Sequence, residues 1–345
     1  MYYPTTFDTI IKTKIYTHGA DVDGVSCAIL AIIAFPNVDY ELFANPEELN
    51  KKLEEDLNTH KLDNYNSVFI TDLPVFKENL GRINNTKELR RKVVIIDHHM
   101  RTIDEGALNY DFCYVQEKLD ERFTCATELF YRWLYMKSFI FDLSEMFDYV
   151  EHVRQNDTWE WRDKGDFGDF SHKLSYLLNE NGADEYINSF CRKLLYEPTL
   201  RFSKSDEEVI KCHEEKVKEE LKKALNSVEY FVDKDDNKVA VLFAPYFLRN
   251  EISDYIRKTH KPNEISYVII VSLDVCEHGQ KSYRRVDGVC DLNKIASMMN
   301  GGGHKNSARV MISKKQREKM DSFGDQKEAL QYIINQKYIE ETNRL

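Results

Sequence analysis

The sequence predicts an α/β protein with two domains. The N-terminal domain is built on a parallel sheet, and a helical linker joins it to a smaller α/β C-terminal domain. Three observations support this fold class. Short apolar runs alternate with helical patterns at the start of the chain, a highly charged helical stretch follows at 204–226, and strand patterns return after residue 228. The 345 residues suffice for two domains of roughly 100–200 residues each.

The segments that predict strands in the first part of the chain are 14–17, the alternating segment 39–44, and the apolar runs 68–71 and 93–96. Helical patterns lie between them at 25–35, which Pro36 ends, and at 46–57, which Pro46 begins. Buried strands of parallel sheets are continuously apolar and are connected through helices. We therefore expect a parallel sheet with helices on both faces.

Helical patterns dominate the middle of the chain, at 124–156 and at 169–195. The stretch 204–226 is dense in Glu and Lys, with apolar residues at helical spacing, which predicts an exposed linker helix. Strands are expected again at 228–232, 239–243 and 267–273. The predicted boundaries are 1–200 for the first domain, 201–227 for the linker and 228–345 for the second domain.

The composition excludes several classes of protein. The formal charge is 48 − 59 = −11, which argues against binding of long or duplex nucleic acid. It is compatible with a small phosphorylated ligand if bound cations supply positive charge. No run approaches the roughly 18–20 apolar residues that span a bilayer. The first four residues do not resemble the start of a signal peptide, so we expect a cytoplasmic protein without a membrane partner.

The cysteines give a further exclusion. The chain has seven, an odd number, and no Cys-x-x-Cys pair, which argues against a disulfide framework or a structural zinc site. The oligomeric state is left open, and a homodimer is compatible with these features.

Polar residues follow three of the predicted strands. They are His18, Asp21 and Asp23 after the first strand, Asp72 after the third, and Asp97-His98-His99 after the fourth. Ligands of open α/β sheets bind beyond the carboxyl ends of the strands, so we expect these groups to converge on one rim. Carboxylates and imidazoles together suit divalent ions such as manganese.

The spacing of these residues suggests a separate role for each of them. Asp21 and Asp23 can point to the same side of an extended loop, and Gly24 allows a tight entry to the next helix. Asp72 stands alone and could bridge two metal ions. Adjacent side chains diverge, so His98 and His99 should serve as one ligand and one catalytic group.

Single residues of this kind usually have a structural role. An Asp at a strand end is most often a helix cap, and an isolated His, such as His152, is usually structural. The combination of all three groups, in this order and at strand ends, is what indicates a metal site.

These residues resemble the DHH phosphoesterase superfamily, which includes RecJ-like nucleases, nanoRNases and cyclic-dinucleotide phosphodiesterases. The matching segments are 18–24, 69–72, 94–99 and Asp157 within Gln155-Asn156-Asp157-Thr158. The Asp-His-His triplet after an apolar strand is the motif that names the family. Many members have three residues between the first His and the first Asp, where this chain has two.

The resemblance implies a ligand set and roles for the triplet. Two manganese ions would be held, one by His18, Asp21 and Asp72, the other by Asp23, Asp72, His98 and Asp157. Asp97 would orient an imidazole, and His99 would contact the scissile phosphate or help proton transfer.

A glycine-rich segment, Asn300-Gly301-Gly302-Gly303-His304-Lys305, follows a predicted helix at 292–299. Three glycines alone suit a helix-capping loop, but His304 and the upstream Ser282-Tyr283-Arg284-Arg285 favour phosphate binding. The second half thus resembles the DHH-associated C-terminal domain. The resemblance implies substrate binding by Ser282, Arg284, Gly301, Gly302, Gly303 and His304, with His304 also reaching the scissile phosphate as a catalytic group. Asn300 replaces a glycine that many members carry, and Asn tolerates left-handed backbone angles.

The resemblance also implies the reaction, in-line hydrolysis of a phosphodiester at two metal ions. The two-domain layout is similar to that of nanoRNases, which trim short oligoribonucleotides to mononucleotides; some also hydrolyse 3′-phosphoadenosine 5′-phosphate. The expected partner is therefore a short single-stranded RNA or a dinucleotide. A cyclic-dinucleotide or linear-dinucleotide phosphodiesterase is the alternative. A non-enzymatic scaffold is disfavoured because the ligand set is complete.

Overall fold

The computed structural model describes residues 11–140, 144–197, 199–233, 235–275, 277–287 and 290–342. The chain divides into two compact units, residues 1–210 and 211–345. The boundary falls inside helix α10 (Lys204–Leu225), the segment that the sequence predicts as a linker helix. Among the described residues no helix is long and apolar enough to cross a membrane.

The first unit is built on a parallel sheet, as predicted, which has a fifth strand that the sequence did not predict. Its strands are β1 (Thr13–His18), β2 (Val38–Phe43), β3 (Ser67–Thr71), β4 (Val93–Asp97) and β5 (Cys113–Val115). Their order is β2-β1-β3-β4-β5, and all four neighbouring pairs are parallel. The direction of winding changes between β1 and β3, which is where such sheets bind ligands.

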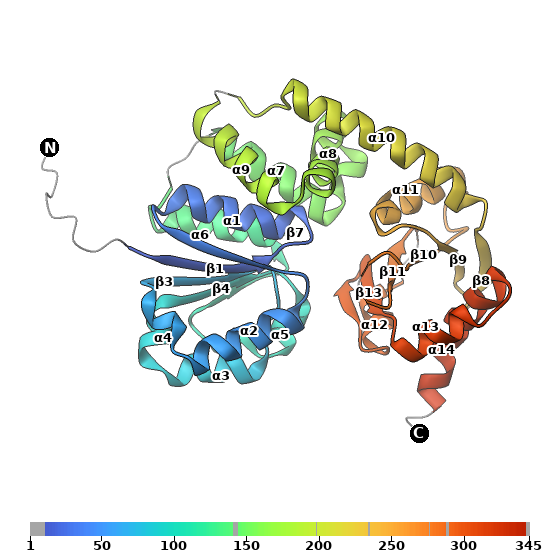
Figure 1. Cartoon of the computed structure of the whole chain (residues 1–345), viewed down its shortest axis with the longest axis horizontal. Helices are drawn as coiled ribbons and strands as arrows, with labels where there is room; N and C mark the ends of the chain where they lie inside the picture. Colours follow the sequence, from blue (N-terminus) through green and yellow to red (C-terminus); the bar gives the residue numbers. More distant parts are fainter. Residues whose placement is uncertain are drawn as a thin grey trace, which may run out of the picture. The chain divides into compact units, whose positions relative to one another are not determined.

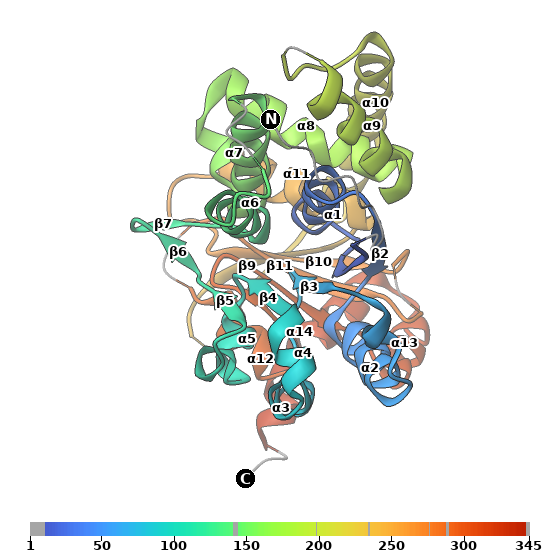
Figure 2. The ribbon, with the colours of Figure 1, turned by 90° about the vertical axis from the view of Figure 1, so that its left-hand side faces the viewer.

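Helices cover both faces of this sheet, again as predicted (Figures 1 and 2). One face carries α1 (Val22–Ala34), α6 (Ala126–Met136), α7 (Ser144–Thr158), α8 (Gly165–Asn181) and α9 (Ala183–Tyr196). The other face carries α2 (Pro46–Asn58), α3 (Lys77–Asn85), α4 (Lys87–Lys92) and α5 (Met100–Asp104). Alternate strand residues divide between the two cores. Ile15 and Phe69 enter the first, whereas Tyr16 and Ile70 enter the second.

Two features of this unit differ from the prediction. The expected helix at 169–195 is two helices, α8 and α9, because Gly182 between them has a φ of 77°. A short hairpin, β6 (Lys118–Leu119) and β7 (Arg122–Phe123), precedes α6 where no strand was expected.

The second unit has a mixed six-stranded sheet. In chain order its strands are β8 (Glu229–Val232), β9 (Lys238–Phe243), β10 (Tyr267–Ser272), β11 (Gln280–Arg285), β12 (Gly302–His304) and β13 (Ser307–Met311). The spatial order is β12-β13-β11-β10-β9-β8, and only β9 and β10 are parallel among these described strands. Its helices are α11 (Arg249–Thr259), α12 (Leu292–Ser297), α13 (Lys314–Asp321) and α14 (Gln326–Thr342).

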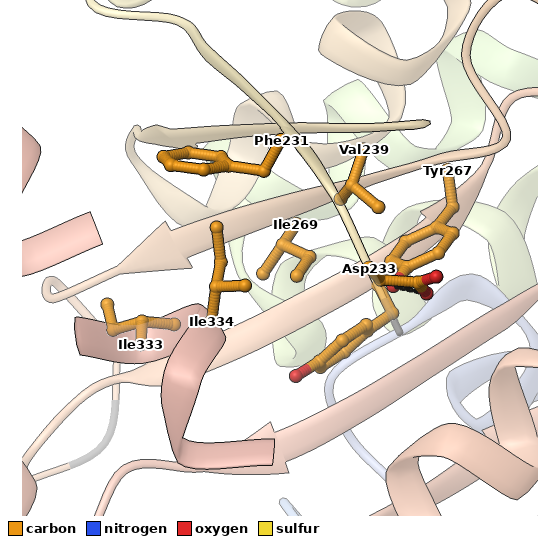
Figure 3. A pocket seen from close by; sticks show the side chains of 8 residues that line it. Phe231, Asp233, Val239, Tyr267, Ile269, Ile333 and Ile334 are labelled. Atoms are coloured by element: carbon orange, nitrogen blue, oxygen red, sulfur yellow. Dashed lines mark hydrogen bonds between the residues drawn. The ribbon is translucent and has the colours of Figure 1, made fainter. Parts of the chain in front are cut away.

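One face of the second sheet packs against α14 through Ile333 and Ile334 (Figure 3). A small hollow remains there, with apolar walls and one carboxylate, that of Asp233. The Tyr267 hydroxyl donates to Asp233 Oδ2 at 2.8 Å, and the amide of Asn237 donates to Asp233 Oδ1 at 3.0 Å. These bonds satisfy the carboxylate inside the core, so we interpret the hollow as a packing feature.

Six of the seven cysteines lie among the described residues, and each of these is a free thiol. Cys276 lies outside the described residues. The expectation that the chain has no disulfide framework holds for the part of the chain that the structure describes.

Candidate metal centre

The carboxyl ends of β1, β3 and β4 meet at one edge of the first sheet. His18 is the last residue of β1, Asp72 directly follows β3, and Asp97 is the last residue of β4. Because β1, β3 and β4 are consecutive neighbours, these side chains and those next to them in sequence gather at one rim. The predicted convergence is therefore present.

A first group of side chains forms around His18. Its Nδ1 lies 2.7 Å from Asp21 Oδ2 and 3.6 Å from Asp72 Oδ2. Its other ring nitrogen, Nε2, lies 3.3 Å from the carbonyl oxygen of Ala44, which fixes the ring with Nδ1 toward the carboxylates. The shortened spacing before Asp21 thus still lets His18 join a group that could hold a metal ion.

A second group forms around His98 and comprises Asp23, His98 and Asp157. The His98 Nδ1 donates to the carbonyl of Thr124 at 3.1 Å, so Nε2 is the ligand atom, and it lies 3.6 Å from Asp23 Oδ2. Asp157 comes from the end of α7, and its Oδ2 is 3.7 Å from His98 Nδ1.

Asp72 lies between the two groups. Its Oδ1 is 3.3 Å from His98 Nε2, and its Oδ2 faces His18. The residue is only 1% exposed, and Oδ2 accepts no hydrogen bond from any residue that the structure describes. A buried carboxylate oxygen without a donor is costly unless a cation binds it. The geometry is that of a carboxylate able to bridge two ions.

The backbone of Asp72 is unusual as well. Its φ is 58°, in the left-handed region, where Asp and Asn occur more often than other non-glycine residues. The turn is held by a hydrogen bond from the Asp72 amide to the carbonyl of Ile96 at 3.1 Å. Strain of this kind is often kept where a side chain must be aimed at a ligand.

Asp97 holds the loop that carries the two histidines. Its Oδ1 accepts from the amide of His98 at 2.8 Å and from His99 Nδ1 at 2.7 Å, and its Oδ2 accepts from the Thr102 hydroxyl. With Nδ1 donating to Asp97, His99 directs Nε2 away from that carboxylate. The rings of His98 and His99 lie edge to face with centroids 4.5 Å apart, so the expected divergence of these side chains is wrong.

Burial and like charge shift the pKa values at this rim. Burial raises the pKa of Asp72 well above its usual range, and Asp23 and Asp21 add to the shift. Burial raises the pKa of Asp157 to about 7, although His98 opposes the change. Burial disfavours charged His18, but Asp21 and Asp72 outweigh it and raise the pKa of His18 to about 10. The protein alone thus retains protons that metal ions would displace.

The expected positions of Asp21 and Asp23 in an extended loop need correction. Asp21 is the N-cap of α1, and its Oδ1 accepts from the amide of Gly24 at 3.0 Å. Asp23 lies in the first turn of α1 and points to a different ligand group from Asp21. The tight entry at Gly24 is present, because a Cβ there would lie 2.2 Å from the carbonyl oxygen of His18.

The N-terminus of α6 binds the carboxylate of Asp23. Asp23 Oδ2 accepts from the Ala126 amide at 2.7 Å, and Oδ1 accepts from the Thr127 amide at 2.8 Å. A helix N-terminus favours an anion there and fixes its orientation. Sequence reasoning missed these donors, although the helical pattern expected from residue 124 places the start of a helix here.

A network of charged side chains anchors the carbonyl that orients His98. The Thr124 hydroxyl donates to Glu128 Oε2 at 2.7 Å, and Glu128 Oε1 accepts from Arg122 at 2.5 Å and from Arg132 at 3.2 Å. Arg122 lies in strand β7 of the hairpin. The hairpin therefore fixes the segment that leads from β5 to α6.

The predicted clamp residues lie in the second unit on strands β11 and β12, with Gly301 directly before β12, and β13 lies between these two strands in the sheet. Ser282 has no exposed surface and accepts from Gln280 Nε2 at 3.1 Å. Arg284 is also buried, and its Nη1 donates to the carbonyl of Tyr283 at 3.0 Å. In this structure both side chains are engaged within the sheet.

The glycine-rich segment is more ordered than the expected loop. Gly302–His304 form β12, and Asn300 takes the left-handed backbone angle expected for it, with a φ of 57°. A Cβ on Gly301 would lie 2.2 Å from the Arg309 carbonyl oxygen, and one on Gly303 2.4 Å from that of Ser307. Two of the glycines are therefore required by close backbone packing, whereas a Cβ on Gly302 would meet nothing within 4 Å.

Comparison with known proteins agrees with this architecture. Residues 12–151 match the model of the DHH family, N-terminal domain. These residues form a DHH family N-terminal domain. The match includes every predicted metal ligand except Asp157.

The chain is also similar over most of its length to a curated relative. It is 29% identical over 308 residues to oligoribonuclease NrnB of Bacillus subtilis (strain 168), a match that covers 87% of this chain and 72% of that protein. Family and relative support a hydrolase of phosphoester bonds, so the predicted enzyme class is confirmed.

Two solved structures share the fold. The DHH domain of a protein described as a member of a family of ribosomal proteins superimposes with a TM-score of 0.56 at 17% identity, covering 89% of this chain and 84% of that one. CDC45 from Entamoeba histolytica gives a TM-score of 0.53 at 11% identity, covering 92% and 94%. These likenesses show the fold alone.

Proposed function

We propose that this DHH protein is a manganese-dependent phosphodiesterase that hydrolyses short oligoribonucleotides to mononucleotides. The observation that carries the proposal is the position of Asp72, whose two carboxylate oxygens face two separate groups of ligands. The substrate class is taken from the similarity to an oligoribonuclease over most of the chain. The acidic net charge of −11 suits a short substrate better than a long one.

The donor set fits two divalent ions. His18, Asp21 and Asp72 would hold one, and Asp23, Asp72, His98 and Asp157 would hold the other. Oxygen and imidazole ligands without thiolate suit manganese or magnesium better than a soft metal. Such a pair supplies activation of water and polarisation of the phosphoryl oxygens when bound.

His99 and Asp97 would act on the substrate side of this centre. Asp97 is fully buried, and burial would raise the pKa of this carboxyl, but the contact with His99 outweighs it and holds the pKa at about 2. The ionised carboxylate fixes the His99 ring through Nδ1. His99 would then present Nε2 to the scissile phosphate, where it stabilises negative charge or transfers a proton.

The second unit would bind the nucleotide. Arg284, the glycine strand and His304 are the proposed substrate contacts, with Ser282 supporting the strand from inside. Because Arg284 is engaged with backbone carbonyls in this structure, its contact with a phosphate would require a change of rotamer. A cytoplasmic location belongs to the same proposal.

A single assay tests the substrate class. Purified protein is given manganese and, in parallel, an RNA dinucleotide, a longer RNA, cyclic di-AMP and 3′-phosphoadenosine 5′-phosphate. We expect the dinucleotide to be hydrolysed fastest, and an Asp72→Asn variant serves as the inactive control. Preference for the cyclic compound over the linear dinucleotide would replace this proposal with a cyclic-dinucleotide phosphodiesterase, and no turnover of any of the four would favour a scaffold.

A further inference from the structure

The first unit has a surface hollow of about 520 Å³ at the edge of its sheet, remote from the metal centre. It exists because β5 is short. Strand β5 pairs only with Ile95, Ile96 and Asp97 of β4, so Val93 and Val94 at the start of β4 have no strand beside them on that side. The hollow is the notch left next to these two residues.

Helices from both faces of the sheet border this notch. Lys87, Arg90 and Arg91 come from α4 on one face, and Trp133 and Lys137 come from the end of α6 on the other (Figure 1). The metal centre lies at the opposite end of β4. Val93 and Asp97 are four residue steps apart along the strand, which at about 3.3 Å per step is roughly 13 Å.

The charge of this hollow is opposite to that of the whole chain. Four cations line it, Lys87, Arg90, Arg91 and Lys137, against one carboxylate, that of Asp111, in a chain of net charge −11. Arg90 is neutralised, because its Nη2 and Nε bind the two oxygens of Asp111 at 2.7 and 3.1 Å. Within the described part of the chain, Lys87, Arg91 and Lys137 have no carboxylate within salt-bridge distance.

Aromatic side chains stand beside these cations. Trp133 and Tyr114 line the hollow, and the Lys137 ammonium lies 6.0 Å from the centre of the Trp133 ring. Trp133 makes an edge-to-face contact with Phe69, with centroids 5.3 Å apart, and stacks on Phe139, with centroids 5.9 Å apart, so its ring is held in place. A fixed indole next to several cations is the combination with which proteins bind a nucleic-acid base together with its phosphate.

We infer that this hollow is a second nucleotide-binding site, in which Lys87, Arg91 and Lys137 bind a phosphate and Trp133 stacks on the base. The ligand chemistry is that of a ribonucleotide with at least one phosphate. It can come from a free mononucleotide or from the distal part of a longer RNA chain. The site is separate from the metal centre and does not depend on the proposed reaction.

The test measures binding without turnover. The full-length protein is dialysed against EDTA and titrated with AMP, with a five-nucleotide RNA and with inorganic phosphate, by equilibrium dialysis. The informative variant is Lys87→Ala/Arg91→Ala. The matched control is Lys51→Ala/Lys204→Ala, which removes two exposed lysines elsewhere and changes the net charge equally.

We expect the control to bind the nucleotide at this site and the double variant either to lack the site or to bind there at least about tenfold more weakly. A Trp159→Phe/Trp161→Phe background, in which Trp133 is the only tryptophan, should show fluorescence quenching by the nucleotide. Equal affinity for AMP and for the RNA would assign the site to mononucleotides, and tighter binding of the RNA would assign it to the chain.

Three results would overturn the inference. These are unchanged nucleotide binding by Lys87→Ala/Arg91→Ala, no quenching of Trp133, or equal binding of inorganic phosphate and AMP, which would leave only an anion patch. Manganese-dependent turnover of a dinucleotide should be the same in the double variant and the control. Its failure in both would count against the proposed reaction and not against this site.

Discussion

Asp72 combines the features that decide the chemistry of this centre. It is buried, its pKa is raised by burial and by neighbouring carboxylates, and its backbone is left-handed. Each feature costs stability in the protein without metal, and burial of the charge is compensated when cations bind. The residue is thus placed for metal binding at the expense of the stability of the metal-free fold.

An Asp72→Asn substitution separates these effects. Asn keeps the left-handed backbone and the shape but carries no charge, so the metal-free variant should unfold at the same temperature as the wild type or higher. The affinity for manganese and the turnover rate should each fall by more than about a hundredfold. This is more than the loss expected when a residue that only orients a ligand is removed. Thermal unfolding in EDTA and metal content after dialysis check this, with exposed Asp104→Asn as control. Retention of manganese by Asp72→Asn would show that the bridging role is wrong.

His152 gives a prediction for pH. Its ring stacks on Phe167 with centroids 3.8 Å apart and bonds to the Ser171 hydroxyl, which supports the structural role expected from the sequence. Burial lowers the pKa of His152 to about 4, below the ordinary value of about 6.5 in the unfolded chain. The neutral ring therefore adds stability above pH 6.5 that is lost as the pH falls from 6.5 toward 4.

A His152→Gln variant checks the sign. Its free energy of unfolding in urea should fall less between pH 7 and pH 5 than that of the wild type, because Gln has no proton to gain. A larger fall in the variant would mean that the folded protein binds the proton more tightly than the unfolded chain.

At the scale of elements, the entry from β1 into α1 is the tightest turn at the site. A Cβ on Gly24 would overlap the His18 carbonyl, whereas a Cβ on Gly81 in α3 meets nothing within 4 Å. We expect Gly24→Ala to lower the melting temperature and the manganese content, since the backbone of His18 must move. Gly81→Ala should raise stability by about 0.5–1 kcal/mol through helix propensity. Equal melting temperatures for the two variants would contradict the close approach.

The hairpin before α6 predicts a positioning role for Glu128. Loss of its carboxylate releases the Thr124 hydroxyl and leaves Arg122 paired with Glu151, so the carbonyl that orients His98 becomes less well fixed. Glu128→Ala should weaken manganese binding about 10–100-fold, as other outer-shell changes do. Arg132→Ala, which removes only the peripheral member of the network, should change it little. Titration with manganese, followed by activity and by calorimetry, compares the two.

The elements also show what can be predicted from the sequence. Apolar runs located β3 and β4, and strand patterns at 14–17 and in the alternating segment 39–44 located β1 and β2. The residues that follow β1, β3 and β4 located the rim, because parallel strands bring their carboxyl ends together. The break at Gly182 was missed because Leu178 and Ile187, on either side of it, pack against the same core and continue the apolar pattern. Strand β5 and the hairpin are too short, at three and two residues per strand, to give a period.

The backbone groups that orient the proposed metal ligands could not be predicted from the sequence either. The carbonyl oxygens of Ala44 and Thr124 and the amides of Ala126 and Thr127 are backbone groups, so their contacts leave no mark on residue type. Only the tertiary structure brings them to His18, His98 and Asp23.

For the whole molecule, each unit has its own cores, two on the sheet faces of the first unit and two in the second. Helix α10 contributes to both units, with Ile210 in a core of the first and Val217 in a core of the second. The proposed metal ligands all belong to the first unit.

Metal binding should therefore stabilise one unit selectively. In scanning calorimetry we expect two transitions, of which manganese raises only one. At a free manganese concentration about a hundred times Kd, binding should add about 2.7 kcal/mol to the free energy of unfolding of that unit. The Asp72→Asn variant should show no shift. A single transition that moves as a whole with manganese would mean that the two units unfold together.

The order of the ligands along the chain has a consequence for biosynthesis. The proposed ligands begin at His18 and end at Asp157, and the glycine strand comes only at Gly302–His304. A ribosome makes the chain from its N-terminus, so no nascent chain can hold the complete centre before α7 has emerged. Once residue 210 has also emerged, the first unit, whose core includes α8 and α9, can fold and bind the proposed ions while the second unit, to which we assign nucleotide binding, is still being translated.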